Sequence, residues 1–351
     1  MNKIIEEDTI QIIKNNDMEK LRNSSFLITG ASGMVGSYFV NTLISLNKYL
    51  NMNIKVICLV RNPQKLDEEI RNNPFVKVIV QDVVNPIELD DDVDYIVHAA
   101  SPASPLIMKD KPFETNIANT IGTYNTLNLA LKKKTKGYLF VSSREIYGEP
   151  DENQKYFTEE GPLGQVNPLV PRNGYAEGKK AAENMCIGAK EEYGLNTKIV
   201  RLAHTYGPGM SIYDGRVQAD FLKNIISEED IIMKSTGESV RTYTYIADAI
   251  NAMFKILIES PSCVYNVSSE NCEVSIRNLA ILLSKLSNGT SQVIMKIDDT
   301  NEKGNASFKN GILSSQKIKL ELGWKPIYSL EEGFKRTINY LKETTPNVRR
   351  R

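Results

Sequence analysis

The sequence predicts an α/β fold in which a doubly wound parallel sheet is joined to a smaller C-terminal α/β part. Three observations support this fold class. From Phe26 onward, short apolar segments rich in β-branched residues alternate with long amphipathic segments, as in parallel sheets covered by helices on both faces. A run of glycines follows the first apolar segment, and polar clusters follow several later ones. A chain of 351 residues is long enough for one large core or for two parts that share a cleft.

The order of these segments divides the chain into three regions. Residues 1–24 space apolar positions among charges, which predicts a helical extension that covers the core. The region 25–205 carries the alternating pattern of the sheet domain, and 246–265 returns to it. We expect its strands at 26–29, 54–60, 76–80, 95–97, 138–141 and 197–201, and its two long helices at 112–134 and from residue 175 onward. The remainder of 206–345 is less regular and is expected to form mainly the substrate-binding part.

The glycines after the first predicted strand form a strand, a turn and a helix start that suit a dinucleotide. Gly30 permits the tight turn, Gly33 lets a phosphate approach the backbone, and Gly36 lets the helix and strand pack closely. The spacing is G-x-x-G-x-x-G rather than G-x-G-x-x-G, and a plain strand-to-helix turn is the alternative interpretation. Together with the motifs that follow, this spacing indicates a Rossmann-type domain that binds NAD or NADP.

Tyr175 and Lys179 are the candidate proton-transfer pair. They are four residues apart, so a helix would place them on one face. A tyrosine has a pKa of about 10 and is a poor base at neutral pH, but a nearby ammonium group and a cationic nicotinamide ring favour the phenolate. Tyr175 could then take the proton of a substrate hydroxyl while a hydride leaves the same carbon. Ser142 and Ser143, after the fifth predicted strand, could donate hydrogen bonds to the same oxygen.

The composition argues against several other classes of function. The chain has 43 Lys and Arg residues and 43 Asp and Glu residues, a balance that gives no reason to expect a nucleic acid or a membrane surface as partner. Its four cysteines are scattered and it has two histidines, so we expect neither a metal site nor disulfides. The N-terminus is charged and no apolar run reaches membrane-spanning length, from which we expect a soluble, cytoplasmic protein.

Several longer motifs carry a resemblance to a known family. They are the segments HAASPASP (98–105), NTIGT (119–123), VNPLVPRNGYAEGK (166–179), TYGPGM (205–210), DGRV (214–217) and RTYTYIAD (241–248). Over 26–341 the chain resembles the extended short-chain dehydrogenase/reductases that act on nucleotide sugars. Within that family it is most similar to the UDP-glucuronate decarboxylases, also called UDP-xylose synthases.

The resemblance implies oxidation of the sugar at C4 by bound NAD, a change at C4 or C5 of the ketone, and return of the hydride. It implies that Tyr175 is the base, that Lys179 lowers the pKa of Tyr175 and holds the ribose, and that Ser143 binds the C4 oxygen. Glu145 stands where the family places a carboxylate near C5. A nucleotide-sugar 4,6-dehydratase, a C4 epimerase or reductase, and a non-catalytic NAD(P)-binding protein are the alternatives.

The same resemblance implies two sets of contacts. Cofactor contacts are expected from Gly30, Ser32, Gly33, Met34, Val35, Gly36, Arg61, Asp82, Val83, Ala99, Ala100, Ser101, Asn119, Ser142, Tyr175, Lys179 and His204, the last of which has packing as its alternative role. Substrate contacts are expected from Pro105, Arg144, Glu145, Arg172, Thr205, Arg216, Val217, Phe221 and Arg241.

Two residues depart from the family pattern. The decarboxylases have Ser-Thr-Ser-Glu where this chain has Ser142-Ser-Arg-Glu145, so Arg144 replaces a small residue beside the reacting carbon. It could clamp a carboxylate or phosphate, or it could block the ordinary substrate. Arg61 follows the second strand, where NAD-using relatives have Asp or Glu. An arginine there suits the 2′-phosphate of NADP, and a solvated side chain is the alternative.

The family also implies an assembly. Its members commonly pair through two long helices, so we expect a homodimer formed by the helix at 112–134 and the helix that begins at residue 175.

Overall fold

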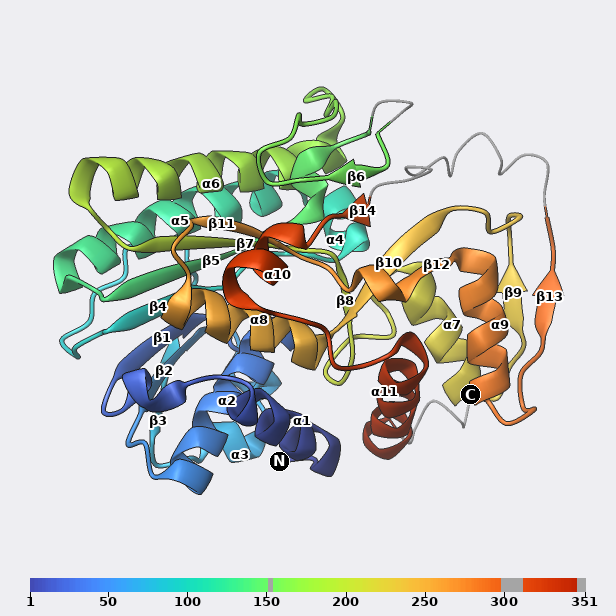
Figure 1. Ribbon diagram of the computed structural model, residues 1–351, viewed down its shortest axis with the longest axis horizontal. Coiled ribbons are helices and arrows are strands. Elements are labelled where there is room, and N and C mark those ends of the chain that lie inside the picture. Colours follow the sequence, from blue (N-terminus) through green and yellow to red (C-terminus); the bar gives the residue numbers. More distant parts are fainter. Residues whose placement is uncertain (151–153, 298–311, 346–351) are drawn as a thin grey trace.

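The computed structural model describes residues 1–150, 154–297 and 312–345. Its centre is a parallel seven-stranded sheet in the order β11-β7-β5-β4-β1-β2-β3 (Figure 1). The strands are β1 (Ser25–Thr29), β2 (Lys55–Val60), β3 (Val76–Val80), β4 (Tyr95–His98), β5 (Gly137–Ser143), β7 (Thr197–Leu202) and β11 (Val264–Val267). The first three strands follow one another outward, and β4 then pairs with the other side of β1. Doubly wound folds bind ligands at such a change of direction.

Helices cover both faces of this sheet, as Figure 1 shows. On one face lie α5 (Pro112–Lys133) and α6 (Gly174–Tyr193), which pack against each other. On the other lie α2 (Met34–Leu50) and α8 (Ile246–Glu259), with α1 (Lys3–Lys14) packed on both of them. Within β1, Phe26 and Ile28 join the core on the α2–α8 side, whereas Leu27 joins the core on the α5–α6 side. Burial on both faces explains why the strands are almost continuously apolar.

A smaller part lies beyond one end of the sheet (Figure 1). It contains a three-stranded sheet of β8 (His204–Tyr206), β10 (Val240–Tyr245) and β12 (Glu273–Ser275). The pairs β9 (Ile231–Met233) with β13 (Val293–Met295) and β6 (Tyr156–Phe157) with β14 (Ile312–Leu313) complete its strands. The remaining α-helices that the structure describes are α3 (Glu68–Arg71), α4 (Pro105–Asp110), α7 (Val217–Ile226), α9 (Ile276–Leu286), α10 (Gln316–Leu322) and α11 (Leu330–Thr344).

The predicted fold class is confirmed, and two details differ from the expectation. Strand β5 continues through Ser143, so Ser142 and Ser143 belong to the strand rather than to the loop after it. The region after 205 is also more regular than its sequence pattern indicated, because α7, α9, α10 and α11 all form there. Within the region 206–345, residues 298–311 lie outside the described part of the chain.

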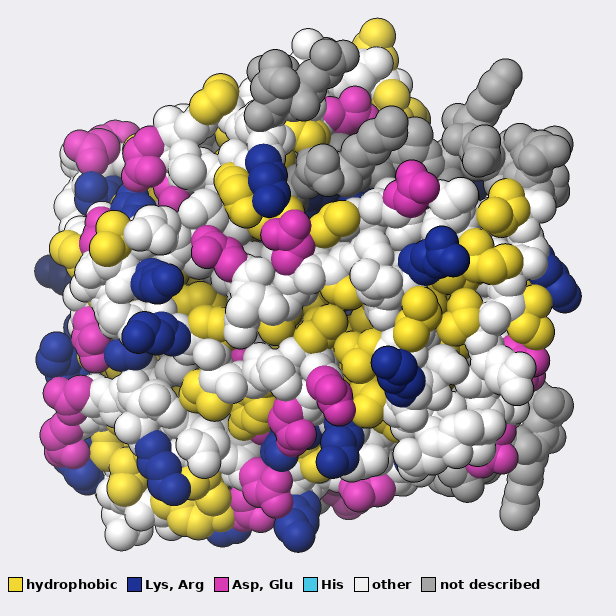
Figure 2. Space-filling model, turned by 45° about the vertical axis from the view of Figure 1, so that its right-hand side comes forward, with side chains coloured by type: hydrophobic (Ala, Val, Ile, Leu, Met, Phe, Trp, Pro, Cys, Tyr) yellow, Lys and Arg dark blue, Asp and Glu magenta, His cyan; other side chains and the backbone are white. Residues whose placement is uncertain are grey.

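Charged side chains are mixed on the surface. On the face shown in Figure 2, Lys and Arg side chains lie among Asp and Glu side chains, and no large area carries a single sign of charge. Of the helices that the structure describes, none combines the length and the apolar character needed to cross a membrane.

A buried carboxylate joins the N-terminal helix to both parts of the molecule. Asp8 on α1 is fully buried and accepts hydrogen bonds from the hydroxyls of Tyr38 on α2, Tyr245 on β10 and Tyr328. Its Oδ1 atom also lies 2.9 Å from Nη2 of Arg336 on α11. Burial raises the pKa of the Asp8 carboxyl, although the hydroxyl of Tyr38 and the charge of Arg336 oppose that increase. These contacts make Asp8 a fixed point between the sheet domain and the C-terminal helix.

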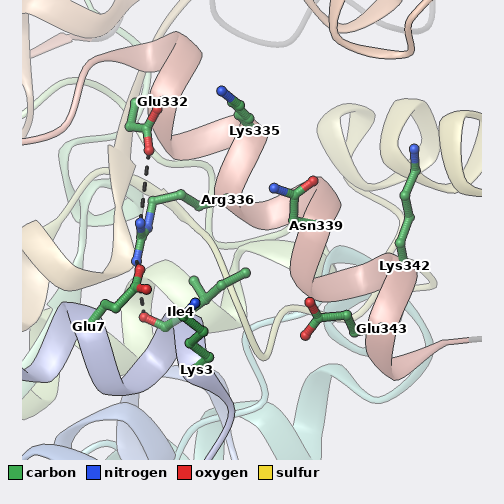
Figure 3. Close-up of a pocket in the computed structure, with 9 residues that line it drawn as sticks. All are labelled: Lys3, Ile4, Glu7, Glu332, Lys335, Arg336, Asn339, Lys342 and Glu343. Carbon is green, nitrogen blue, oxygen red and sulfur yellow. Dashed lines mark hydrogen bonds and ion pairs between the residues drawn. The ribbon is translucent and has the colours of Figure 1, made fainter.

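The guanidinium of Arg336 extends this contact to the surface. Figure 3 shows it between Glu7 on α1 and Glu332 on α11, in a shallow pocket between the two helices. Its Nη2 atom lies 3.1 Å from Oε2 of Glu7 and also donates to the carbonyl of Ile4. The N-terminal helix is therefore held to the C-terminal helix by ion pairs and a hydrogen bond.

The substitution Asp8→Asn tests this role. The amide has no charge for Arg336, and its NH₂ group would face tyrosine hydroxyls that now donate to a carboxylate. We expect the free energy of unfolding to fall by about 3 kcal/mol, as when one member of a buried ion pair is removed. Urea unfolding followed by circular dichroism measures the change.

The matched control is Tyr328→Phe, which removes one hydrogen bond from the same carboxylate and should cost about 1 kcal/mol. If Asp8→Asn costs no more than this control, Asp8 does not hold the two parts together.

Candidate active site

The glycine turn lies at the change of direction between β1 and β4. Gly30 has a φ of +67°, and a Cβ atom added to it would lie 2.8 Å from the Cα atom of Ala100. A Cβ atom at Gly36 would collide with the carbonyl oxygen of Gly30. Gly33 is the N-cap residue of α2, whose first hydrogen bond joins the N–H of Ser37 to the Gly33 carbonyl. The backbone is therefore open at a helix N-terminus, where a phosphate can approach it.

The other predicted cofactor residues line the same edge of the sheet. Ser32 lies in the glycine turn, and Met34 and Val35 lie at the start of α2. Ala99, Ala100 and Ser101 follow β4, and the Ser101 hydroxyl donates to Oδ1 of Asn119 on α5 at 2.8 Å. The loop after β4 and helix α5 are thus fixed to each other beside the turn.

At the outer end of this edge, Arg61 and Asp82 face each other. Arg61 follows β2, Asp82 follows β3, and Nη1 of Arg61 lies 3.7 Å from Oδ2 of Asp82. The Arg61 side chain is 69% exposed. Val83 is buried, and a Cβ atom added to Gly122 on α5 would lie 2.8 Å from it. A carboxylate thus reaches the end of β2 from the neighbouring strand, although β2 itself ends in an arginine.

The histidine at the end of β4 has a structural environment. His98 is 1% exposed, and its Nδ1 atom lies 2.7 Å from the hydroxyl of Thr29 on β1. Burial, and secondarily the charge of Lys179, lowers the pKa of His98 to about 3. His98 is therefore neutral and ties β4 to β1 rather than serving as a base.

The structure brings Tyr175, Lys179 and Ser143 together between α6 and β5. Lys179 is 2% exposed, and its Nζ atom donates to the carbonyl of Val141 at 2.7 Å and lies 5.9 Å from the centre of the Tyr175 ring. Burial lowers the pKa of Lys179 to about 7. Burial also raises the pKa of Tyr175, and hydrogen bonds with Ser143 and Ser101 only partly oppose this. The protein groups alone therefore do not produce the lowered tyrosine pKa that the Tyr–Lys spacing led us to expect.

Ser142 is engaged on the opposite side of β5 from Ser143. Its hydroxyl donates to Oε1 of Glu183 at 2.5 Å, and the other carboxylate oxygen of Glu183 lies 2.7 Å from Nη2 of Arg201. Adjacent residues of a strand face opposite sides of the sheet, so the expectation that Ser142 and Ser143 bind the same substrate oxygen does not fit this arrangement. Glu183 was not among the residues predicted from the sequence, although it lies four residues after Lys179 on the same helix.

A cluster of guanidinium groups lies next to the tyrosine. Arg144 is 5% exposed, with its Nη1 atom 3.7 Å from Oε1 of Glu145, while Nη2 of Arg172 lies 3.8 Å from Oε2 of the same carboxylate. Burial lowers the pKa of Arg144, Glu145 raises it, and Arg172 lowers it. Arg241 on β10 has a pKa lowered by burial and then by Arg144. We call Arg144, Arg172, Arg216 and Arg241 the arginine cluster.

Arg216 belongs to this cluster through His204 on β8. Burial lowers the pKa of His204 well below its usual value, and the charges of Arg144, Arg241 and Arg216 lower it further. Arg216 also pairs with Asp214 at 2.5 Å and donates to the carbonyl of Ala103 in the loop after β4. The smaller part thus places its cations against the edge of the central sheet.

The other predicted substrate residues occupy three elements. Thr205 lies on β8, and Pro105 is the first residue of α4, which contacts the short helical turn that contains Arg172. Val217 opens α7, whereas Phe221 on the same helix is a buried core residue. Among the described residues, no group of three or more His, Cys, Asp or Glu side chains could hold a metal ion.

Comparison with known proteins places this geometry in a family. The model of the NAD dependent epimerase/dehydratase family matches residues 26–268. The chain is 32% identical to UDP-glucuronic acid decarboxylase 1 of Xenopus tropicalis, over 90% of this chain and 72% of that protein. It is 30% identical to UDP-glucuronic acid decarboxylase 3 of Arabidopsis thaliana, over 89% of this chain and 90% of that protein.

Solved structures share the fold. UDP-glucose 4-epimerase of Thermotoga maritima with UDP-glucose has a TM-score of 0.76 at 24% identity, covering 91% of this chain and 99% of that one. UDP-glucuronic acid 4-epimerase of Bacillus cereus, in complex with UDP-glucuronic acid and NAD, has a TM-score of 0.74 at 20% identity over the same shares. With the family model covering more than half of the sequence, the chain is an enzyme of the NAD dependent epimerase/dehydratase family.

Proposed function

We propose that this enzyme oxidises C4 of a nucleotide-bound sugar with bound NAD or NADP and returns the hydride after a change at C5 or C4. Decarboxylation of UDP-glucuronate is the leading reaction. One observation carries the proposal: Tyr175, Lys179 and Ser143 converge beside the glycine turn, and the arginine cluster adjoins them. The similarity to UDP-glucuronic acid decarboxylases supports the choice of reaction.

The cofactor fits the edge of the sheet that the glycines leave open. The turn from Gly30 to Gly36 would hold its diphosphate at the N-terminus of α2, and Asp82 and Val83 would lie beside its adenosine. When bound, the nicotinamide supplies the hydride acceptor and donor. Lys179, held by the Val141 carbonyl, would position the ribose next to Tyr175.

Proton transfer is the task of Tyr175. Its hydroxyl, hydrogen-bonded to Ser143, would take the proton of the C4 hydroxyl during oxidation and return it during reduction. Ser143 would hold the same C4 oxygen. A ketone at C4 makes a carboxylate on C5 the carboxylate of a β-keto acid, which loses carbon dioxide readily. Charge then builds up on the C4 oxygen, where the hydroxyls of Tyr175 and Ser143 can stabilise it.

We propose that the smaller part, mainly 206–345, binds the substrate. Its residues Arg216 and Arg241, together with Arg144 and Arg172, offer planar donors to the diphosphate and to a sugar carboxylate. Two other reactions fit the same residues: a 4,6-dehydratase with Glu145 as the base at C5, and a C4 epimerase.

A turnover assay followed by mass spectrometry, with UDP-glucuronate, UDP-glucose, dTDP-glucose, GDP-mannose and CDP-glucose, tests the reaction. We expect loss of carbon dioxide from UDP-glucuronate.

Tyr175→Phe should lower the rate about 10²- to 10⁴-fold, because it removes the proton-transfer group, with little effect on cofactor binding. Tyr193→Phe, on the same helix but 61% exposed, is the control. Loss of water would show that the enzyme is a dehydratase. A product of unchanged mass, detected by NMR, would show that it is an epimerase. A panel without any product would contradict the proposal.

Arg61 and Asp82 set the choice between the two cofactors. A 2′-phosphate would gain the charge of Arg61, while a 2′-hydroxyl could donate to Asp82. Arg61→Asp should therefore lower the affinity for NADP relative to NAD by about tenfold or more. Titration calorimetry of the purified protein with both cofactors measures the ratio. An unchanged ratio would mean that the Arg61 side chain is merely solvated.

We also propose a homodimer formed through α5 and α6. Phe113, Ile121 and Tyr124 on α5 are 75%, 43% and 57% exposed and lie along one side of the helix. Such a stripe is unusual on a surface that stays in water. A second copy of the chain would cover it.

The double substitution Ile121→Glu with Tyr124→Glu should convert the dimer into a monomer, because it buries carboxylates in the proposed contact. Size-exclusion chromatography with light scattering measures the mass. The control is Leu320→Glu on α10, where a leucine that is 73% exposed lies outside the proposed contact. A wild-type monomer, or a double variant that still dimerises, would count against this interface.

A further inference from the structure

Asn119 lies against the helix that carries Tyr175 and Lys179. Its side chain is fully buried on α5, and a Cβ atom added to Gly178 on α6 would lie 3.0 Å from the Cβ atom of Asn119. Gly178 directly precedes Lys179 and lies three residues after Tyr175. A polar side chain is costly to bury unless it has hydrogen-bond partners, so the partners of this amide indicate what it does.

The hydrogen bonds of Asn119 fix the orientation of its amide. Its Nδ2 atom donates to the carbonyl of Thr115, one turn earlier on α5, at 2.9 Å. The amide oxygen Oδ1 therefore faces the other way, where it accepts a hydrogen bond from the hydroxyl of Ser101 at 2.8 Å. A serine hydroxyl has a single hydrogen. While Ser101 donates to Asn119, it can only accept a hydrogen bond from Tyr175.

The hydrogen bonds at Tyr175 then all run in one direction. Tyr175 is hydrogen-bonded to both Ser143 and Ser101. Because Ser101 donates elsewhere, Tyr175 is the donor in the bond between them, and Ser143 must donate to Tyr175. The Ser143 hydroxyl is suited to this, since its oxygen already accepts the N–H of Glu145 at 3.2 Å. Ionisation of Tyr175 removes the hydrogen that Ser101 accepts and breaks this chain.

We infer that Ser101 is a positioning residue that changes its hydrogen-bond acceptor with the ionisation of Tyr175: it donates to Asn119 while Tyr175 is protonated and to the phenolate oxygen once the proton has left. The inference rests on the proposed function, in which Tyr175 loses and regains a proton in each turnover. Rotation of the Ser101 hydroxyl about its C–O bond is sufficient, because Oγ is hydrogen-bonded to both partners. Asn119 thus competes with the phenolate for one hydrogen. It favours the neutral tyrosine, whereas Ser101 stabilises the phenolate.

Other groups also act on the ionisation of Tyr175, and they remain in place when Ser101 or Asn119 is substituted. Burial has the largest effect and raises the pKa of Tyr175. The polar and charged side chains that face it are Ser143 on β5, which lowers the pKa, Glu145 after β5, which raises it, Arg216 before α7, which lowers it, and Lys179 on α6, 5.9 Å from the centre of its ring.

Titration of Tyr175 itself tests the inference. The protein is saturated with NAD, without a nucleotide sugar, and isotope-labelled at the Cζ atom of tyrosine. The NMR signal that Tyr175→Phe lacks belongs to Tyr175, and its shift against pH gives the pKa. Ser101→Ala should raise this pKa and lower the fraction of phenolate about tenfold, because a hydrogen bond to a charged oxygen is lost. Asn119→Leu should raise that fraction, because it removes the competing acceptor at similar side-chain volume.

Three further variants separate this role from a structural one. Ser101→Thr keeps the hydroxyl and should keep the wild-type pKa. In the double variant Ser101→Ala with Asn119→Leu, the second substitution should have no effect of its own, because the hydroxyl for which Asn119 competes is gone. The control is Thr120→Val, which removes a hydroxyl next to Asn119 that donates to the Asn116 carbonyl at 3.0 Å. It should leave the pKa of Tyr175 unchanged.

Three results would overturn the inference: shifts of the same sign for Ser101→Ala and Asn119→Leu, no shift for Ser101→Ala, or an effect of Asn119→Leu that persists without the Ser101 hydroxyl. The second result does not need the variant at Asn119, so poor folding of Asn119→Leu does not shield the inference. If the shifts have the expected signs but no nucleotide sugar is converted, the proposed function fails while the role of Ser101 stands. If a nucleotide sugar is converted but Ser101→Ala causes no shift, only the inference fails.

Discussion

The buried ion pair between Glu183 on α6 and Arg201 on β7 positions the helix on which the proposed chemistry depends. Nη2 of Arg201 lies 2.7 Å from Oε2 of Glu183, and the hydroxyl of Ser142 on β5 donates to the other carboxylate oxygen. Tyr175, Lys179 and Glu183 follow one another at intervals of four residues, so they share a face of α6. The contacts that hold Glu183 against β5 and β7 therefore also fix the rotation of α6 about its axis. They thereby fix the positions of Tyr175 and Lys179 at the edge of the sheet.

The same network supports the segment that carries the cations. Nη1 of Arg201 lies 2.7 Å from the hydroxyl of Tyr147, which in turn donates to Oδ1 of Asn266 on β11. Tyr147 ends the turn that begins with Arg144, and its ring stacks on Phe157. The helix that carries Tyr175 and Lys179 and the turn that begins with Arg144 thus share one buried polar support. A buried polar network stabilises the fold only when each of its polar groups has a hydrogen-bond partner. The Glu183 carboxylate and the Arg201 guanidinium at its centre both have such partners.

The sequence predicted best what depends on local geometry. The glycine turn and the Tyr175–Lys179 spacing are set by neighbouring residues, and the structure places both at the expected edge of the sheet. The sequence carries a helical pattern for at least one helix after residue 205. The buried residues of α9, from Ile276 to Leu283, lie three and four positions apart. Loops rich in Gly, Pro and Tyr between these short elements hid that signal.

What the sequence could not predict depends on contacts between distant residues. Ser142 looked like a partner of Ser143 because the two are adjacent, but the pleat of β5 turns its hydroxyl toward Glu183, 41 residues away. Asp8 looked like one charge among several in an N-terminal helix, and its partner Arg336 lies near the other end of the chain. Whether a polar residue is catalytic, structural or solvated can be decided only when its partner is known. A single sequence does not reveal partners at such separations.

Burial moves the titratable groups of this site toward their neutral forms. It lowers the pKa of Lys179 to about 7, lowers that of Arg144, and raises that of Tyr175. A desolvated site of this kind holds charge poorly unless a charge of the opposite sign is brought into it. Under the proposed function, an anionic substrate would restore the balance around the arginines, and the free energy of that contact would become available to orient the sugar at Tyr175 and Ser143. The proposed recognition of charge by the arginine cluster and the proposed proton transfer at the edge of the sheet would therefore both depend on the same exclusion of water.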